Sequence, residues 1–205
     1  MSEIKNVIFD LGGVLLNINY NKTAEAFKSL GFPDFDQMYT QYKGDDFFDS
    51  LEMGHLAEEF FLEHMMRASH KQVSRENIIN AWNAMLADFR LNSLQFLVQL
   101  KNTHSLFLLS NTNIIHQRSF DKFFKEQTGF ESLNSFFKKA YYSHEIGLRK
   151  PNKDIFEFVL KDAGITAEET LFIDDSFPNT EAAQKLGIKT HLLLSGEKIE
   201  DLNYN

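Results

Sequence analysis

The sequence predicts an α/β protein in which helices cover a parallel sheet, and three observations support this fold class. Short apolar segments alternate with segments of helical periodicity along most of the 205 residues. Alternation of this kind builds βαβ units, whose parallel strands form one sheet with helices on both faces. Polar residues recur where the apolar segments end, and a long stretch of helical character follows the first of these segments.

Five short segments have the character of buried strands, because apolar residues run together in them and turn-forming residues follow. The first ends at Asp10, shortly before the pair Gly12-Gly13, which predicts a tight turn. The predicted strands cover residues 4–9, 105–110, 140–143, 170–173 and 188–194.

Four segments between these strands carry apolar residues at helical spacing. Pro151 precedes the third of them and Gly164 ends it, while Gly187 ends the fourth. Proline at a helix start and glycine just past its end are typical of helix boundaries. The predicted helices cover residues 91–100, 114–127, 152–163 and 179–186.

Residues 17–88 interrupt the alternation, because their pattern is helical throughout. Breaks in it fall at Gly31-Phe32-Pro33, Gly44 and Gly54. The economical interpretation is a small helical domain inserted after the first strand. The sequence therefore predicts two domains, a core formed by residues 1–16 and 89–205 and a helical domain formed by residues 17–88.

Composition excludes several classes of protein. Twenty-nine acidic and 21 basic residues give a formal net charge of −8, which argues against a nucleic-acid partner, since such proteins carry a basic face. The absence of cysteine excludes disulfides, thiolate metal sites and cysteine nucleophiles. No run of about 18 apolar residues occurs, so we expect no membrane partner and a cytoplasmic location.

Residues suited to chemistry follow the strands of the predicted sheet. The carboxyl ends of parallel strands meet at one edge of a sheet and line its ligand crevice. Four separate segments would therefore converge on one pocket that holds three carboxylates, one ammonium group and one hydroxyl. These residues are Asp10, Ser110 with Asn111, Lys150, and Asp174 with Asp175.

Three neighbouring carboxylates repel one another unless a cation lies among them. Ligands that offer only oxygen select a hard ion, and a site that also receives phosphate suits Mg²⁺. Lys150 and Ser110, with the backbone amides after Ser110, would bind phosphate oxygens. Asp10 is the candidate nucleophile, because Gly12 and Gly13 let the backbone fold closely around the ion.

Four sequence motifs, in order, give the chain a family resemblance. They are FDLGGVL (9–15), LLSNTN (108–113), GLRKP (147–151) and FIDDS (172–176). Across roughly residues 4–194 the chain resembles the haloacid dehalogenase superfamily of hydrolases, and its details look closest to bacterial sugar-1-phosphate phosphatases. The resemblance implies a Rossmann-like core with an inserted helical cap. It also implies that Asp10 is the nucleophile, that Ser110 and Lys150 bind phosphate, and that Asp174 and Asp175 surround Mg²⁺.

Gly12 departs from the pattern of most phosphatases in this family, which carry a second Asp there as general acid/base. The family binds metal through the backbone carbonyl at this position, and Gly12 supplies one. What the missing Asp side chain removes is the usual group that protonates the leaving group. We therefore hypothesise either a substrate with an acidic leaving group, such as an anomeric sugar hydroxyl, or an acid delivered by the cap.

Each site residue also has an ordinary structural interpretation. Asp174, Asp175 or Ser110 could cap a helix, since Asp and Ser are favoured at helix N-termini. Lys150 could be a solvated loop residue, and Asn111 could bond only to nearby backbone. We favour the functional roles because the four motifs occur together.

Other polar residues have a weaker claim to a role. Glu52 or His55 could lie over the active site, although the aromatic residues around them predict mostly a domain core. His116 and His144 lie near the motifs, but scattered histidines are mostly surface or core residues, and no zinc signature occurs.

The favoured function is a Mg²⁺-dependent phosphatase acting on a small phosphorylated substrate, by a monomer or homodimer. A metal-independent dehalogenase is less compatible with the pair Asp174-Asp175, which without a cation would repel a carboxylate substrate. A phosphomutase is disfavoured by the missing acid/base. The alternative of another class is a non-catalytic module that binds phosphate without turnover.

Overall fold

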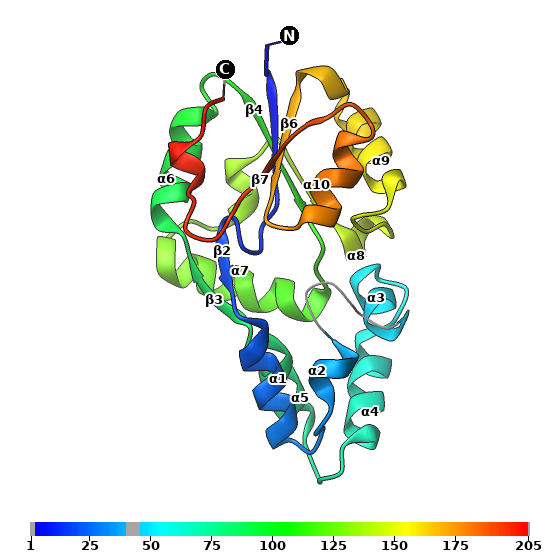
Figure 1. Ribbon diagram of the computed structural model, residues 1–205. Coiled ribbons are helices and arrows are strands. Elements are labelled where there is room, and N and C mark those ends of the chain that lie inside the picture. Colours follow the sequence, from blue (N-terminus) through cyan, green and yellow to red (C-terminus); the bar gives the residue numbers. More distant parts are fainter. Residues whose placement is uncertain (1–2, 40–45, 205) are drawn as a thin grey trace.

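The computed structural model describes residues 3–39 and 46–204, so the predicted break at Gly44 lies outside the described residues. Its centre is a parallel sheet with strand order β5-β4-β1-β6-β7 (Figure 1). The strands are β1 Asn6–Phe9, β4 Ser105–Ser110, β5 Lys139–Tyr142, β6 Thr170–Asp174 and β7 Lys189–Leu192. All five predicted strands are present.

The central strands β1, β4 and β6 are buried on both faces, because helices pack on each side of the sheet. Alternate residues of β1 point to opposite faces, so that Val7 and Phe9 enter one hydrophobic cluster while Ile8 enters another. Helices α6 and α7 cover the first face, and α9 and α10 cover the second. The helices of this part are α6 Leu91–Leu100, α7 Ile114–Thr128, α8 Ser143–Ile146, α9 Lys153–Ala163 and α10 Phe177–Gln184, with 3₁₀ turns at Leu133–Phe136, Ala167–Glu169 and Ile199–Asp201.

Helix α10 begins two residues earlier than the sequence predicts and ends at Gln184. Pro178 lies in its first turn, where the missing backbone N–H of proline costs no hydrogen bond. The prediction therefore placed this proline before the helix when it belongs inside it.

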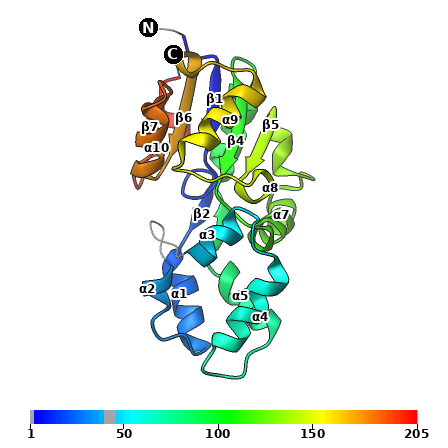
Figure 2. The same cartoon turned by 90° about the vertical axis from the view of Figure 1, so that its right-hand side faces the viewer.

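A second group of helices extends from the carboxyl edge of the sheet (Figures 1 and 2). Aromatic residues form its core: Phe27 stacks on Phe35 with ring centroids 4.1 Å apart, and Phe48 stacks on Trp82 at 5.5 Å. Ile115 of α7 joins the same cluster and so ties these helices to the core. The helices are α1 Tyr20–Ser29, α2 Phe35–Met38, α3 Asp46–Glu52, α4 Glu58–Ala68 and α5 Arg75–Asn83.

Two short strands connect this helical part to the core, and the sequence interpretation missed them. Strands β2 Leu16–Ile18 and β3 Leu86–Phe89 pair antiparallel, with Leu16 opposite Phe89. The stretch 17–88 is therefore not helical throughout, because its two ends form a ribbon. Both predicted domain boundaries fall inside this ribbon, and the division into two domains stays a prediction.

No helix in the part of the chain that the structure describes is both long enough and apolar enough to cross a membrane.

Candidate active site

The sheet brings three of the predicted site residues together. Asp10 directly follows β1, Ser110 ends β4, and Asp174 ends β6. Strand β1 lies between the other two and pairs with both, with Phe9 opposite Leu108 on one side and Ile173 on the other. The three side chains therefore emerge beside one another at the carboxyl edge of the sheet.

Lys150 joins the two buried carboxylates. Its Nζ donates to Asp10 Oδ1 at 2.6 Å, to Asp174 Oδ2 at 2.7 Å and to the Leu109 carbonyl at 2.9 Å. The side chain is only 1% exposed. Burial alone would lower the pKa of Lys150, but Asp10 and Asp174 raise it above its ordinary value, so the ammonium group stays charged.

Neighbouring groups act in opposite directions on the pKa of the Asp10 carboxyl. Burial raises its pKa to about 7, Lys150 opposes this rise, and Asp174 and Asp175 add to it. A bound cation would reverse the balance, because it favours the ionised carboxylate. The three carboxylates therefore favour a bound cation among them.

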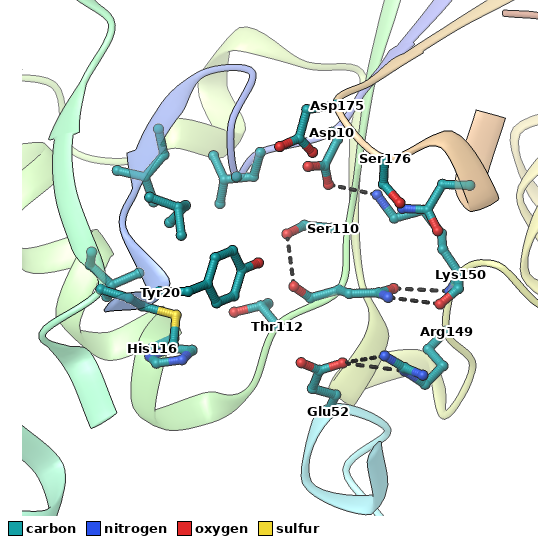
Figure 3. A pocket seen from close by; sticks show the side chains of 18 of the residues that line it. Asp10, Tyr20, Glu52, Ser110, Thr112, His116, Arg149, Lys150, Asp175 and Ser176 are labelled. Carbon is teal, nitrogen blue, oxygen red and sulfur yellow. Dashed lines mark hydrogen bonds and ion pairs between the residues drawn. The ribbon is translucent and has the colours of Figure 1, made fainter. Parts of the chain in front are cut away.

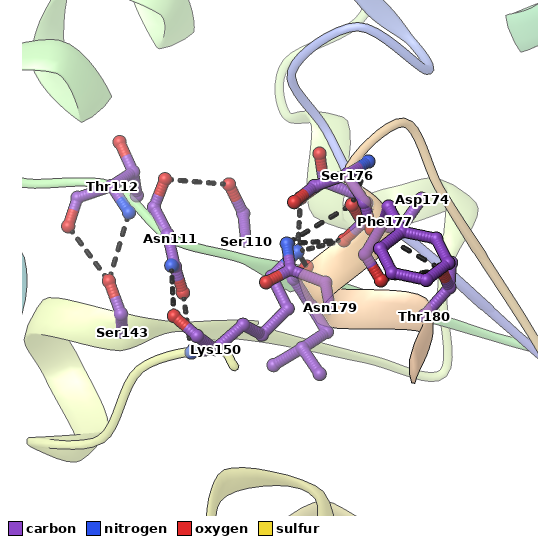
Figure 4. Close-up of polar contacts among 12 residues, drawn as sticks. Ser110, Asn111, Thr112, Ser143, Lys150, Asp174, Ser176, Phe177, Asn179 and Thr180 are labelled. Atoms are coloured by element: carbon purple, nitrogen blue, oxygen red, sulfur yellow. Dashed lines mark hydrogen bonds and ion pairs between the residues drawn. The ribbon is translucent and has the colours of Figure 1, made fainter. Parts of the chain in front are cut away.

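Asp174 is held by a network as well as by Lys150 (Figure 4). Its Oδ1 accepts from the Ser176 backbone N–H at 2.8 Å, and Asn179 Nδ2 lies 3.1 Å from both of its oxygens. Ser176 is the N-cap residue of α10, so Asp174 ties the start of that helix to the site. The N-cap position itself belongs to Ser176, so neither Asp174 nor Asp175 is the cap residue of this helix, and the functional role of Asp174 stays a prediction.

The three carboxylates fit a magnesium ion. Asp10, Asp174 and Asp175 each offer an oxygen, and these oxygens lie within 4.8 Å of one another. Gly13 makes room for this cluster: at φ +74° its backbone runs so close to Asp175 that a Cβ would lie 2.1 Å from Oδ2. An all-oxygen donor set beside a phosphate-sized space is the chemistry that Mg²⁺ prefers.

Asn111 positions Lys150. Its side chain accepts from the Lys150 backbone N–H at 2.9 Å and donates to the Lys150 carbonyl at 2.8 Å. With the side chain engaged in this clamp, the predicted phosphate contact would come from the Asn111 backbone N–H. The helix after this turn is capped by Asn113, which accepts from the N–H groups of Ile115 and His116, so Ser110 is not its cap.

Above these residues lies a cavity of about 280 Å³ that is lined from both the core and the helical part. Arg149 crosses it and donates to Glu52 Oε2 from Nη2 at 2.9 Å and from Nε at 3.2 Å (Figure 3). Tyr39 donates to the other Glu52 oxygen at 3.3 Å. Tyr20, the first residue of α1, points its hydroxyl into the cavity on the side of Ser110 (Figure 3).

Gly12 lines the same cavity, but Ile18 of β2 occupies the space beside it. A Cβ on Gly12 would lie 3.2 Å from Ile18 Cγ1 and 4.0 Å from Asp10 Oδ2. A larger side chain at position 12 would therefore have to displace Ile18.

Comparison with known proteins identifies the family. The haloacid dehalogenase-like hydrolase family matches residues 4–187. This chain belongs to that family. The prediction from the four motifs is confirmed, and the predicted α/β fold with it.

Individual relatives match along nearly the whole chain. The chain is 32% identical to a D-ribitol-5-phosphate phosphatase of Bacteroides thetaiotaomicron, with 91% of this chain and 90% of that protein covered. It is 36% identical, at a TM-score of 0.90, to a crystallised enzyme variant of the family from B. thetaiotaomicron in complex with magnesium and inorganic phosphate, covering 96% of both chains. A predicted HAD-like hydrolase from Porphyromonas gingivalis matches at 35% identity and a TM-score of 0.86, covering 96% of this chain and 94% of the other. The magnesium complex agrees with the predicted cofactor.

The sequence interpretation overlooked several residues that the structure brings to the site. Arg149 was part of a quoted motif but received no role, and Tyr20, Tyr39 and Asn179 received none. Glu52 was considered, and the structure places it on the cavity wall. The roles of the predicted residues, the oligomeric state and the cellular location stay predictions.

Proposed function

We propose that this hydrolase releases inorganic phosphate from a small sugar or alditol phosphate through a covalent aspartyl-phosphate on Asp10. The observation that carries the proposal is the cluster of Asp10, Asp174 and Asp175 around one point, with Lys150 beside it at the carboxyl edge of the sheet. The related ribitol-phosphate phosphatase supports the substrate class.

Lys150 orients the nucleophile. Because its ammonium group holds Asp10 Oδ1, the other oxygen, Oδ2, is the one that attacks phosphorus. The three N–H groups of this ammonium go to Asp10, Asp174 and the Leu109 carbonyl, so it would stabilise the phosphate by its charge. The Ser110 hydroxyl and nearby backbone N–H groups would donate to the phosphate oxygens. The three carboxylates and the backbone carbonyl of residue 12 would hold Mg²⁺, which when bound would add positive charge beside the phosphate.

Two displacements complete the reaction. In the first, Asp10 Oδ2 forms a bond to phosphorus while the bond to the substrate alcohol breaks, and the alcohol takes up a proton. In the second, water displaces Asp10 from phosphorus, which regenerates the carboxylate and yields inorganic phosphate. Gly12 has no side chain to supply the proton of the first step, so the two hypotheses on the leaving group stay in place. Ribitol 5-phosphate is an ester of a primary alcohol, a poor leaving group, and this favours an acid delivered from the cap side.

The test is phosphate release from a panel of sugar 1-phosphates, alditol phosphates, nucleotides and simple alkyl phosphates. We expect turnover that requires Mg²⁺, stops in EDTA and is lost in Asp10→Asn. Faster turnover of sugar 1-phosphates than of primary esters would favour the acidic leaving group, and equal turnover would reject it. Silence across the panel would support the non-catalytic module, while turnover of a 2-haloacid in EDTA would support the dehalogenase.

A further inference from the structure

The cavity has two chemically different ends. The catalytic end carries Asp10, Ser110 and Lys150, which the proposed phosphatase reaction uses. The opposite end carries polar groups that this reaction does not use, from the helical part of the chain and from the loop before Lys150. They include Tyr39, Glu52 and Arg149, while Tyr20 of the helical part points its hydroxyl into the cavity on the side of Ser110 (Figure 3).

Tyr20 presents a hydroxyl that has no hydrogen-bond partner among residues 3–39 and 46–204, and it points into the cavity (Figure 3). Burial raises the pKa of this hydroxyl well above its ordinary value, and the carboxylates of Glu52 and Asp175 raise it further, so it stays protonated. It therefore offers a donor to whatever occupies the cavity. Because the residue is only partly buried, this hydroxyl can reach a ligand oxygen in the cavity and donate to it.

Glu52 supplies the matching acceptor. The two bonds from Arg149 both go to Oε2, whereas among residues 3–39 and 46–204 the one hydrogen-bond partner of Oε1 is the Tyr39 hydroxyl, at a long 3.3 Å. A carboxylate oxygen can accept two hydrogen bonds, so Oε1 has capacity left for a ligand. Only 8% of Glu52 is exposed, which makes a lost partner costly.

Arg149 is paired with two carboxylates, whose combined negative charge exceeds its own positive charge. Its Nη1 donates to Asp49 at 2.9 Å, while Nε and Nη2 donate to Glu52. Among the described residues that line the cavity, the only cationic ones are Arg149 and Lys150, and carboxylates pair with both. The end away from the nucleophile therefore suits a neutral group.

We infer that Tyr20 and Glu52 recognise neighbouring hydroxyl groups on the alcohol part of the substrate, and that they select a neutral polyhydroxy phosphomonoester. A hydroxyl group is both donor and acceptor, so a Tyr hydroxyl and a carboxylate oxygen together match adjacent hydroxyls. A cavity of about 280 Å³ lies near the lower limit of small-molecule sites, which fits a chain of five or six carbons. This inference rests on the proposed phosphatase function and adds to it the residues that choose the substrate.

The test compares ribitol 5-phosphate with pentyl phosphate, which has the same chain length and the same primary ester but lacks the hydroxyls. We expect the wild-type enzyme to prefer ribitol 5-phosphate by roughly 100-fold or more in kcat/KM, because a site built for hydroxyls rejects an analogue without them. Tyr20→Phe and Glu52→Gln should each reduce that preference about tenfold, the effect of one lost hydrogen bond.

Two variants serve as matched controls. Tyr141→Phe removes a hydroxyl that donates to Asp162 outside the cavity, and Glu59→Gln neutralises a carboxylate that pairs with Arg75 on the surface. Both should keep the wild-type preference. Tyr20→Phe removes no contact within the described protein, so its folding, checked by thermal unfolding, should be unaffected.

The outcomes separate the inference from the function on which it rests. Equal loss on both substrates in Tyr20→Phe and Glu52→Gln, or an unchanged preference, would overturn the inference and leave the phosphatase intact. Wild-type enzyme inactive on both substrates and on the wider panel would overturn both together. A selective fall in the preference in both variants, with the controls unchanged, supports the inference.

Discussion

Replacing Gly13 by Ala should expel Asp175 from the metal site. The backbone at Gly13 has φ +74°, and a Cβ there would lie 2.1 Å from Asp175 Oδ2 and 2.5 Å from its Cγ. Atoms do not approach so closely, so the Asp175 carboxylate must move. Gly129 is a matched control, because it has φ +73° and nothing within 4 Å of its would-be Cβ.

Both substitutions place an alanine in the left-handed backbone region, but only Gly13→Ala also brings a Cβ against Asp175. An alanine in the left-handed region costs about 1–2 kcal/mol, so Gly129→Ala should lower the free energy of unfolding by that amount. At about 2–4 °C per kcal/mol for a protein of this size, its Tm should fall by about 2–8 °C. Gly13→Ala should show this loss together with the cost of displacing Asp175.

Magnesium provides the decisive measurement. Mg²⁺ at roughly 100 times its Kd stabilises a folded protein by about 2.7 kcal/mol, and a variant that binds it roughly 100-fold more weakly gains only about 0.4 kcal/mol. Differential scanning fluorimetry with and without Mg²⁺ should therefore show a rise in Tm of about 5–10 °C for the wild-type protein and for Gly129→Ala. Gly13→Ala should show almost none. An undiminished Mg²⁺ shift in Gly13→Ala would refute the placement of Asp175 in the metal site.

Three further predictions concern the buried charges. Lys150→Met should destabilise the metal-free protein by about 3–5 kcal/mol in chemical denaturation at neutral pH, because Asp10 and Asp174 lose their shared partner; a loss below about 1 kcal/mol would contradict that pairing. Asn111→Ala should lower kcat roughly tenfold with little change in KM, since its side chain positions Lys150, whereas a rise in KM alone would indicate direct phosphate binding. In metal-free protein, burial raises the pKa of Asp10 from 3.8 to about 7, so between these values the folded state holds more protons than the unfolded state. The contribution of Asp10 to stability therefore falls as the pH rises from about 4 to 7, and unfolding in EDTA should show a more negative pH slope for wild type than for Asp10→Asn; equal slopes would contradict this.

The sequence predicted the core and the catalytic end of the site because both depend on local signals. A strand that ends in a polar residue can be recognised from the few residues around it, and the parallel sheet then brings Asp10, Ser110 and Asp174 together without further information. Lys150 required the motif as well, since its loop is not itself a strand end.

The ribbon of β2 and β3 and the far end of the cavity could not be predicted in this way. Leu16–Ile18 is too short to show an alternating pattern, and its partner lies about seventy positions later in the chain. The pairing of Arg149 with Glu52 likewise joins residues 97 positions apart. Tyr20 gives no signal of its own, because its sequence neighbours do not distinguish a tyrosine that lines a cavity from one that packs in a core. The role of Asn111 could not be predicted from its residue type, because an asparagine can bind phosphate or hydrogen-bond to backbone groups equally well. In the structure its side chain bonds to the Lys150 backbone.

The GLRKP motif connects the two ends of the site through consecutive residues. Arg149 bonds to Asp49 and Glu52 of α3, while its neighbour Lys150 bonds to Asp10 and Asp174. Asn111 binds the Lys150 backbone at both its N–H and its carbonyl, so this segment is fixed at the core while Arg149 contacts the helical part.

Gly54 allows the helical part to pack closely against the core near Arg149. At φ +67° it brings the turn after α3 against the His144 carbonyl, where a Cβ would lie 2.1 Å from that oxygen. The turn can therefore approach the core closely only with glycine at this position, and the approach is what places Glu52 within reach of Arg149. Arg149, which pairs with the proposed hydroxyl-binding Glu52, and Lys150, the proposed partner of the nucleophile, are adjacent in the chain. The proposed recognition of hydroxyls and the proposed phosphate transfer therefore depend on the packing of one short segment.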